Sequence, residues 1–470
     1  MFFNALSQFS NNVAAIEGNE RLSYTQLNDA QGELATSIDK LIGKPSQVIL
    51  IEAYNGISTL IAYLAVLNTN HCAILVEPSP PSGSLNKIIK AFAVSLVIQC
   101  RADKHLNIEV VSHDQQPLAS NKTAVLLTTS GSTGTAKHVA LSRDNLQANA
   151  DSICEYLPIQ SLDKTLCSLP FFYSYGLSVI NTHLNAGACC VFTSANPISK
   201  GYWQLISEHK VNSIAGVPFI YEMLLRLKLT EKELPHLRYL TQAGGKLSPE
   251  KIKALGQYAK DKGKQFFVMY GQTEATARMA FLAPQKVLDK PESIGNAIAH
   301  GEFKLINDLG QLIVEPNIPG ELYYQGPNVM LGYADSREAL ATLDSENLTG
   351  SWLATGDMAI VDSDGDYTIT GRKSRFVKFS GQRIDLDSLE TLLSNKKRQV
   401  ICTGDDAQLI VGLVDNKLTS NESEVVSQLH RQMGIHPSKV CIVLIDTIPI
   451  NKNEKTDYPA LRLLAQGLSQ

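Results

Sequence analysis

Short apolar runs alternate with helix-like stretches along the first part of the chain. The run Val-Ile-Leu-Ile at 48–51 is followed by a helix-like stretch at 59–67. Apolar runs rich in β-branched residues are typical of buried strands. The same alternation recurs three times: a helix-like stretch at 85–92 precedes an apolar run at 96–98, a run at 124–127 precedes a helix-like stretch at 144–156, and a run at 213–217 precedes one at 219–227. Strands and helices in alternation predict an α/β architecture with largely parallel sheets.

The pattern changes near residue 301, where short strands are separated by Gly, Pro, Asn and Asp. These strands are expected at 302–306, 312–315, 321–325 and 367–370. Such spacing indicates an antiparallel or barrel-like subdomain. A basic stretch at 371–383 then leads into a final segment. Its own elements are expected as strands at 400–402, 409–413 and 439–444 and a helix near 424–433.

We place a domain boundary near Arg372. The fold class predicted is α/β, with a large N-terminal domain (1–371) and a small α+β C-terminal domain (372–470). The large domain combines parallel sheets layered with helices and the β-barrel-like subdomain. A length of 470 residues suits two or more domains better than one core.

Composition narrows the class of protein. The chain is 44% hydrophobic and 19% charged, as in ordinary globular proteins, and its net charge of −4 gives no reason to expect nucleic acid as a partner. No apolar stretch reaches the ~18 residues of a membrane span. The N-terminal residues do not have the pattern of a secretory signal, and the eight cysteines include no C-x-x-C pair. We therefore expect free thiols and a cytoplasmic protein.

The stretch TTSGSTGTAK at 128–137 follows the apolar run 124–127. A glycine-rich loop between a strand and a helix can present backbone N–H groups to an anion. Hydroxyl groups and the Lys137 cation would add to that grip. Gly131 and Gly134 are three residues apart, which is not the P-loop spacing, so an ordinary P-loop kinase or ATPase is disfavoured. Taken alone, such a cluster is more often a solvent-exposed loop than a ligand site.

Five further blocks follow this stretch. They are YGQTEA (270–275), GELYYQGPNVMLGY (320–333), TGD (355–357), GRKSRFVKFSGQRID (371–385) and NEKTDY (453–458). In this order the six blocks resemble the signatures of the acyl-adenylate-forming superfamily of acyl-CoA synthetases, peptide-synthetase adenylation domains and luciferases. The resemblance covers essentially the whole chain. It implies that ATP activates a carboxylic acid as acyl-AMP with release of pyrophosphate, and that a thiol then takes the acyl group.

The resemblance also implies which residues bind the nucleotide and its metal ion. The loop residues expected to hold the β- and γ-phosphates are Thr129, Ser130, Gly131, Ser132, Thr133, Gly134 and Lys137. The residues expected around the purine are Gly244, Gly245, Tyr270, Gly271, Gln272 and Thr273. Asp357 and Arg372 would contact the ribose, and Arg383 would lie near the α-phosphate. Glu274 and Thr129 would hold Mg²⁺, a hard cation suited to oxygen ligands.

Lys455 matches the adenylation lysine of the superfamily, which lies in a mobile C-terminal domain. Its charge would bridge the attacking carboxylate and the α-phosphate. Two residues depart from the superfamily pattern: Glu454 replaces the usual glycine, and Ser374 stands where an acidic hinge residue is common. Lys452 competes with Lys455 for the same role. Other cations of the basic stretch, Lys373, Arg375 and Lys378, are expected to be a solvated charge run.

The stretch PFFYSYGLS at 170–178 resembles the block that lines the acyl pocket, with Tyr173 and Ser174 as substrate residues. It contains no acidic residue to pair with an α-ammonium, so we expect an acid without a free α-amine. The acceptor thiol is coenzyme A or a carrier protein that acts in trans. Three alternatives stay open: an amino-acid adenylation enzyme, a non-catalytic nucleotide-binding relative, and a phosphotransferase that produces ADP.

Overall fold

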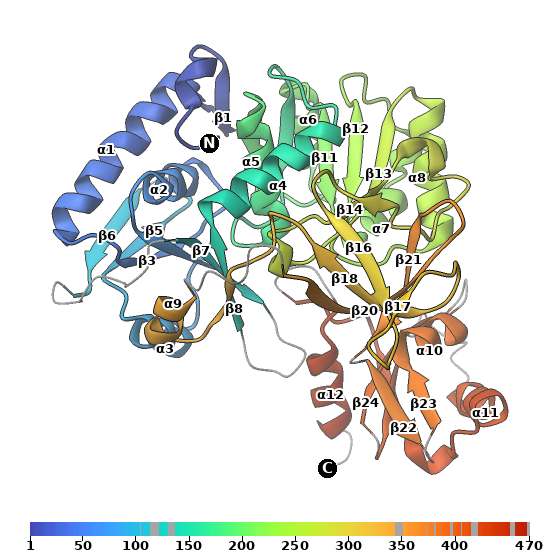
Figure 1. Ribbon diagram of the computed structural model, residues 1–470. Coiled ribbons are helices and arrows are strands. Elements are labelled where there is room, and N and C mark those ends of the chain that lie inside the picture. Colours follow the sequence, from blue (N-terminus) through green and yellow to red (C-terminus); the bar gives the residue numbers. More distant parts are fainter. Residues whose placement is uncertain are drawn as a thin grey trace. The chain divides into compact units, whose positions relative to one another are not determined.

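The computed structural model of the chain divides by its contacts into two compact units (Figure 1). It describes residues 1–103, 105–112, 122–129, 137–343, 351–373, 375–379, 382–394, 398–405, 407–414, 422–451 and 456–467. Unit 1 comprises Met1–Phe303 and Tyr324–Leu353, and unit 2 comprises Lys304–Tyr323 and Ala354–Gln470. These units do not correspond to the two domains expected from the sequence. The domain boundary near Arg372 stays a prediction.

Unit 1 contains a nine-stranded sheet in the order β15-β14-β13-β12-β11-β9-β10-β1-β2. Its strands are β1 Val13–Glu17, β2 Glu20–Ser23, β9 Lys164–Cys167, β10 Cys189–Phe192, β11 Ser213–Gly216, β12 Tyr239–Gln242, β13 Gln265–Tyr270, β14 Ala280–Leu282 and β15 Asn296–Ala297. The run from β13 to β1 is parallel, and the edge strands β14, β15 and β2 are antiparallel. The helices between these strands are α4 Arg143–Tyr156, α5 Ser174–Asn185, α6 Lys200–Glu208, α7 Pro218–Arg226 and α8 Pro249–Asp261.

A second sheet of unit 1 has seven strands in the order β19-β8-β7-β4-β3-β5-β6. They are β3 Val48–Glu52, β4 Cys72–Val76, β5 Leu96–Cys100, β6 Leu106–Val110, β7 Thr123–Thr129, β8 Lys137–Ser142 and β19 Gly332–Ala334. The inner strands β7, β4, β3 and β5 are parallel. Every residue of β3 and β4 is buried, as expected for parallel strands covered on both faces. The predicted α/β architecture with largely parallel sheets is confirmed.

The helices around this sheet are α2 Ile57–Leu67, α3 Ser82–Phe92 and α9 Arg337–Thr342, and α1 Tyr24–Ile42 packs on α2 and on β1 and β2 of the first sheet. Helix α2 is largely apolar and is buried on nearly every side, and it contacts β1 of the first sheet and β3, β4 and β5 of the second. A helix without a polar face is buried, so α2 belongs to the core that both sheets share. On the other face, α3 and α9 lie together in Figure 1 and enclose a second core.

Unit 2 contains most residues of three smaller sheets. The five-stranded sheet runs β17-β16-β18-β20-β21, the pair β22-β23 stands apart, and the last sheet runs β24-β25-β26. These strands are β16 Glu302–Ile306, β17 Leu312–Ile313, β18 Gly320–Gln325, β20 Leu353–Val361, β21 Tyr367–Arg372, β22 Phe376–Phe379, β23 Gln382–Asp385, β24 Gln399–Gly404, β25 Leu409–Val414 and β26 Val440–Ile445. The antiparallel pairs β16–β17 and β20–β21 agree with the expected change of pattern after residue 301.

Three helices complete unit 2: α10 Leu386–Leu393, α11 Glu422–Met433 and α12 Tyr458–Gly467. Alternate residues of β24 face opposite sides, so Val400 and Cys402 join the core under α10 and α11, whereas Ile401 joins the core under α12. All eight cysteines lie within the described residues and form no disulfide bond, as expected. Within those same residues, no helix is both long and apolar enough to cross a bilayer.

Candidate functional site

The strands β7 and β8 position both ends of the predicted phosphate loop. Thr129 at the end of β7 is the register partner of Lys137 at the start of β8, and its hydroxyl is 3.4 Å from the Lys137 carbonyl oxygen. The expectation of a loop between a strand and a helix is wrong, because β8 intervenes and α4 begins only at Arg143. The N-terminus of α4 is already satisfied by the capping box of Ser142 and Asn145. The remaining predicted loop residues, Ser130, Gly131, Ser132, Thr133 and Gly134, lie outside the described residues.

Tyr333 joins the predicted phosphate lysine to the predicted metal ligand. The Lys137 ammonium lies 4.9 Å from the centroid of the Tyr333 ring, and the Tyr333 hydroxyl donates a hydrogen bond of 2.8 Å to Glu274 Oε1. Strand β19 holds Tyr333 in place by pairing with β8. Burial, and the neighbouring Glu274 carboxylate, raise the pKa of Tyr333, so the phenol stays a hydrogen-bond donor. Sequence reasoning missed Tyr333, although it ends the GELYYQGPNVMLGY block.

The backbone that follows Glu274 is strained and held in place. Thr276 has φ of +67°, a conformation that β-branched residues rarely adopt, and the N–H of Ala277 donates to the carbonyl of Ala275 at 2.7 Å. Strain of this kind costs of order 1–3 kcal/mol and persists where neighbouring contacts determine the conformation. Here the Thr276 hydroxyl donates to the Asn328 carbonyl at 2.7 Å, and the buried Asn328 amide donates to the Ala275 carbonyl at 2.9 Å. These bonds restrict the position of Glu274.

Two glycines among the predicted purine residues allow close backbone approach. A Cβ on Gly271 would collide with the carbonyl oxygen of Ala277, and a Cβ on Gly244, which has φ of +82°, would collide with the Tyr173 hydroxyl. The predicted acyl and metal blocks also meet, because the hydroxyls of Ser174 and Thr273 are 3.0 Å apart. The remaining predicted residues of this group, Gly245, Tyr270 and Gln272, lie on the same segments and are at least partly exposed.

The predicted ribose contacts, Asp357 and Arg372, meet within unit 2. They are register partners on β20 and β21, and Arg372 Nε lies 3.1 Å from Asp357 Oδ1. The Asp357 side chain is only 6% exposed, whereas that of Arg372 is 57% exposed. The backbone turns sharply at Gly356, which has φ of +72°, and the Asp357 N–H donates to the Thr355 hydroxyl at 3.1 Å. A carboxylate fixed in this way can accept hydrogen bonds from two adjacent hydroxyls.

Arg375 corrects the expectation of a solvated charge run. Its guanidinium lies 2.9 Å from Asp387 Oδ1 and 2.7 Å from Glu390 Oε1, and it stacks on the Tyr458 ring at 3.7 Å. Its side chain is only 16% exposed, because it ties α10 to the first residue of α12. Lys373 is paired as well, with Glu321 at 2.7 Å. The side chain of Lys378 lies outside the described part of unit 2.

The segment predicted to contain the adenylation lysine is tied at its base. Ile450 and Thr456 form a β-bridge, and the Asp457 N–H donates to the Pro449 carbonyl at 2.8 Å. Lys455 itself, with Lys452, Glu454 and Ser374, lies outside the described residues. Arg383 is part of β23, but its side chain is not among those described. Their roles stay predictions.

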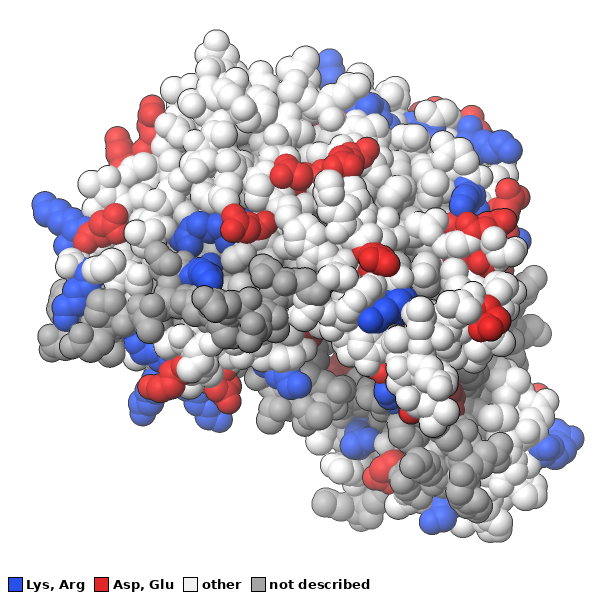
Figure 2. Space-filling view, viewed as in Figure 1, with Lys and Arg blue, Asp and Glu red and all other residues white. Residues whose placement is uncertain are grey.

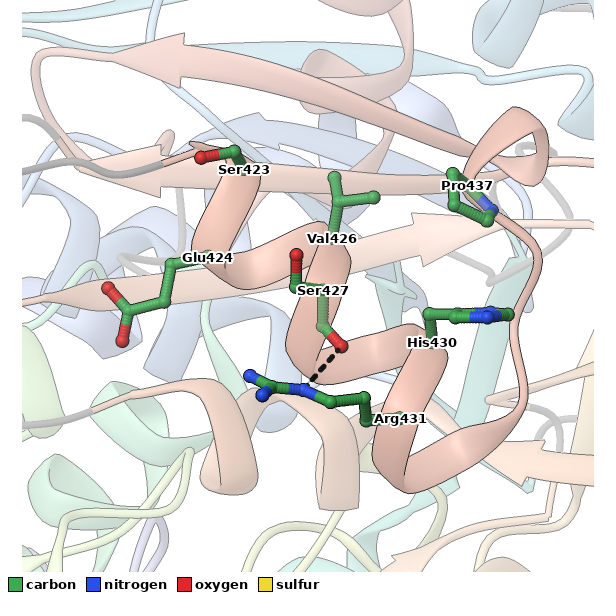
Figure 3. Close-up of a pocket in the computed structure, with 7 residues that line it drawn as sticks. All are labelled: Ser423, Glu424, Val426, Ser427, His430, Arg431 and Pro437. Carbon is green, nitrogen blue, oxygen red and sulfur yellow. Dashed lines mark hydrogen bonds between the residues drawn. The ribbon is translucent and has the colours of Figure 1, made fainter.

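Two other features of unit 2 do not coincide with the predicted site. A shallow depression of about 400 Å³ lies along α11 (Figure 3). It is lined by Ser423, Glu424, Val426, Ser427, His430, Arg431 and Pro437. None of the residues predicted to bind nucleotide, metal or acid lines it, so we do not assign the site there.

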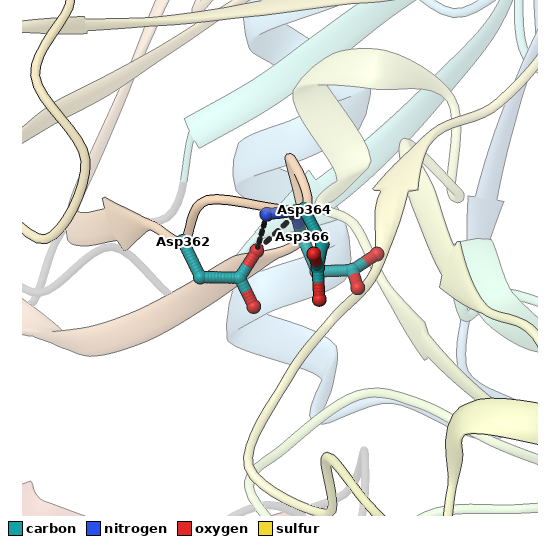
Figure 4. A group of neighbouring side chains, drawn as sticks. All are labelled: Asp362, Asp364 and Asp366. Atoms are coloured by element: carbon teal, nitrogen blue, oxygen red, sulfur yellow. Dashed lines mark hydrogen bonds between the residues drawn. The ribbon is translucent and has the colours of Figure 1, made fainter.

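An acidic turn between β20 and β21 brings three carboxylates together (Figure 4). Oxygen atoms of Asp362, Asp364 and Asp366 lie within 4.8 Å of one another. Asp362 Oδ1 accepts the backbone N–H groups of Asp364 and Asp366, each at 2.9 Å. An aspartate that accepts backbone N–H groups in this way stabilises a turn. The predicted metal ligands Thr129 and Glu274 lie in unit 1, so we do not assign the metal site to this turn.

The face of the molecule in Figure 2 shows no large region of one charge among the described residues. Acidic and basic side chains are interspersed over the face of the molecule in Figure 2. This distribution, with a net charge of −4, gives no electrostatic footprint for nucleic acid on that face.

Comparison with known proteins identifies relatives over most of the chain. The profile of a family described as AMP-binding enzyme matches residues 2–334. A protein described as anguibactin system regulator from Vibrio anguillarum is 24% identical over 98% of this chain, and the chain spans about half the length of that relative, 47%. A 2-succinylbenzoate–CoA ligase of Bacillus pumilus is 29% identical over 73% of this chain and 69% of its own. The structure of o-succinylbenzoate CoA synthetase from Bacillus subtilis with its acyl-adenylate intermediate has a TM-score of 0.78 and 23% identity, covering 100% of this chain and 98% of that one.

Proposed function

The chain belongs to the AMP-binding enzyme family, which confirms the resemblance found in its six blocks, and we propose that it activates a carboxylic acid with ATP. The products would be an acyl-adenylate and pyrophosphate, and a thiol would then take the acyl group. The observation that carries this proposal is the cluster in which Tyr333 links Lys137 to Glu274, beside the contact between Ser174 and Thr273. This cluster combines a cation, a carboxylate and hydroxyls next to the predicted acyl block.

The residues present suit a magnesium nucleotide. The Glu274 carboxylate and the Thr129 hydroxyl are hard oxygen ligands of the kind Mg²⁺ prefers. Thr128 Oγ1 is buried and has no hydrogen-bond partner among the described residues, so a donor or acceptor from a ligand would satisfy it. Lys137 is exposed, so its ammonium group can meet an anion. Mg²⁺, when bound, would supply positive charge to the phosphates.

In the first half-reaction, a carboxylate oxygen of the acid attacks the α-phosphorus of ATP. The new P–O bond forms as the bond to pyrophosphate breaks, and charge on the phosphate oxygens has to be neutralised. Lys137 would neutralise the leaving pyrophosphate, and Asp357 would accept the ribose hydroxyls. Lys455 would align the carboxylate with the α-phosphate, and this is the role that the position in the NEKTDY block supports.

In the second half-reaction, a thiolate attacks the acyl carbonyl and AMP leaves. The thiol belongs to coenzyme A or to the phosphopantetheine of a carrier protein, and both acceptors present the same group. No cysteine of this chain has a part in this scheme. Burial raises the pKa of Cys72 and Cys100 to about 12, which makes them poor nucleophiles.

A pyrophosphate-release screen over fatty, aryl and amino acids tests this proposal, with AMP and ADP separated in every reaction. We expect acid-dependent AMP and pyrophosphate, and afterwards a thioester with coenzyme A or a holo carrier protein. Formation of ADP instead would favour the phosphotransferase alternative. ATP binding without AMP formation across the whole panel would favour a non-catalytic relative, and a clear preference for α-amino acids would favour an amino-acid adenylation enzyme.

A further inference from the structure

Arg278 is a buried cation without a matching anion. It lies four residues after Glu274, and the residue is only 2% exposed. Its Nε and Nη1 atoms are buried and have no hydrogen-bond partner, and no carboxylate pairs with it anywhere in the described part of the chain. A guanidinium removed from water is stable only when an anion and hydrogen-bond acceptors replace the lost hydration. The missing partner therefore has to come from outside these residues.

The titratable groups around Arg278 are neutral. The guanidinium lies over the Tyr175 ring, 5.1 Å from its centroid, and it is also close enough to influence Tyr156, Tyr239 and His183. Burial lowers the pKa of His183 to about 4, so this imidazole carries no charge at neutral pH. Its ring nitrogens are satisfied by the Val179 carbonyl at 2.7 Å and the Tyr239 hydroxyl at 3.0 Å. Aromatic faces attract a cation, but they do not replace an anion.

Arg278 is fixed on the acyl side of the candidate site. Its carbonyl oxygen accepts hydrogen bonds from the side-chain amides of Asn149 at 3.0 Å and Asn328 at 3.1 Å. Tyr175, which it contacts, belongs to the predicted acyl block and is itself held by Thr241 through hydrogen bonds of 2.9 Å. The guanidinium is therefore held beside the block that would bind the acid.

The geometry points to a second anionic group on the acid substrate, bound by Arg278. This inference rests on the proposed function, and it defines the substrate class as a dicarboxylic acid: one carboxylate reacts with ATP and the other pairs with Arg278. A guanidinium offers two parallel N–H groups to a carboxylate, which suits this pairing. An ammonium group at the same position would be repelled, in agreement with the absence of an acidic residue from 170–178.

Pairs of acids that differ by one carboxylate test the assignment, for example succinate with butyrate and phthalate with benzoate. AMP formation is measured for each acid with the wild-type chain and with Arg278→Met, Arg278→Lys and Arg226→Met. We expect at least one diacid to exceed its monoacid in kcat/KM by about 100-fold, in line with the loss of a buried charge pair. The ratio of diacid to monoacid kcat/KM should fall close to one in Arg278→Met. It should stay reduced in Arg278→Lys, because an ammonium group lacks the two parallel N–H groups of a guanidinium. It should be retained in Arg226→Met, because Arg226 is exposed on α7.

Thermal unfolding supplies a readout that does not depend on turnover. The preferred diacid should raise the Tm of the wild-type chain and not that of Arg278→Met. Without ligand, Arg278→Met should unfold no lower than wild type, because the change removes an unpaired buried charge. A lower Tm with an unchanged ratio of diacid to monoacid would make Arg278 a structural residue and overturn the inference. If no acid yields AMP, the proposed function fails, and the Tm shift with diacids still decides the role of Arg278.

Discussion

Two arginines, one in each unit, are withdrawn from water, and their surroundings differ. Arg375 in unit 2 meets two carboxylates and a tyrosine ring, whereas Arg278 in unit 1 meets only neutral groups among the described residues. A buried cation with its partners built in joins elements of the fold, as Arg375 joins α10 and α12. A buried cation without such partners among the described residues is, in our proposal, a site for a ligand. The two arginines thus differ in their partners, and this difference is visible without reference to any relative.

Replacing Arg375 should give the largest effect. Arg375→Met leaves Asp387 and Glu390 without their cation, and breaking a buried pair costs about 3–5 kcal/mol. Urea unfolding of the variant should show a loss of stability of this size. Arg431→Met is the matched control, because Arg431 is exposed on α11 and should change stability little. Equal stability of Arg375→Met and wild type would remove the distinction between the two arginines.

Lys455 is a third cation to compare, and its proposed partners are the attacking carboxylate and the α-phosphate of ATP. Lys455→Ala should slow acid-dependent exchange of pyrophosphate into ATP by about 10²–10³-fold, as for the loss of one group that stabilises a transition state. Lys452→Ala is the control, since it removes a charge three residues away. A larger loss in Lys452→Ala than in Lys455→Ala would transfer the role to Lys452.

The pH dependence of stability tests the environment of Glu390, which pairs with Arg375. Burial raises the pKa of Glu390 from 4.5 to about 7, although Arg375 opposes this rise. The folded chain therefore binds this proton more tightly than the unfolded chain, and the resulting stability is complete below pH 4.5 and is lost as pH rises through 7. The loss is at most about 3 kcal/mol. The free energy of unfolding, measured between pH 4.5 and 8, should fall with rising pH in the wild type and not in Glu390→Gln. The same fall in both proteins would show that other groups cause it.

Tyr333→Phe should give the smallest effect. It removes the hydrogen bond that orients Glu274 but leaves the ring beside Lys137, and loss of a group that orients a metal ligand reduces metal affinity about 10-fold or somewhat more. The Mg²⁺ concentration for half-maximal exchange should rise accordingly. Tyr323→Phe in unit 2 is the control. An unchanged Mg²⁺ requirement would show that Tyr333 only packs against Lys137.

Local pattern alone predicted several elements of this chain. The buried strand β3, the helix α2 and the change to short antiparallel strands after residue 301 could each be predicted, because periodicity and turn residues act over a few neighbouring positions. The six blocks likewise indicated the family without knowledge of any contact.

The pairing of distant side chains could be known only from the tertiary structure. Tyr333 meets Glu274 because β19 pairs with β8, and the phosphate loop joins two strands because β8 precedes α4. Arg375 and Arg278 are both single basic residues in the sequence. Only the fold shows that carboxylates surround Arg375, whereas none pairs with Arg278 within the described parts of the chain, and this difference is the basis for the binding role that we propose for Arg278. The physical reason is that the energy of a buried charge depends on its partners, and those come from segments far away in the chain.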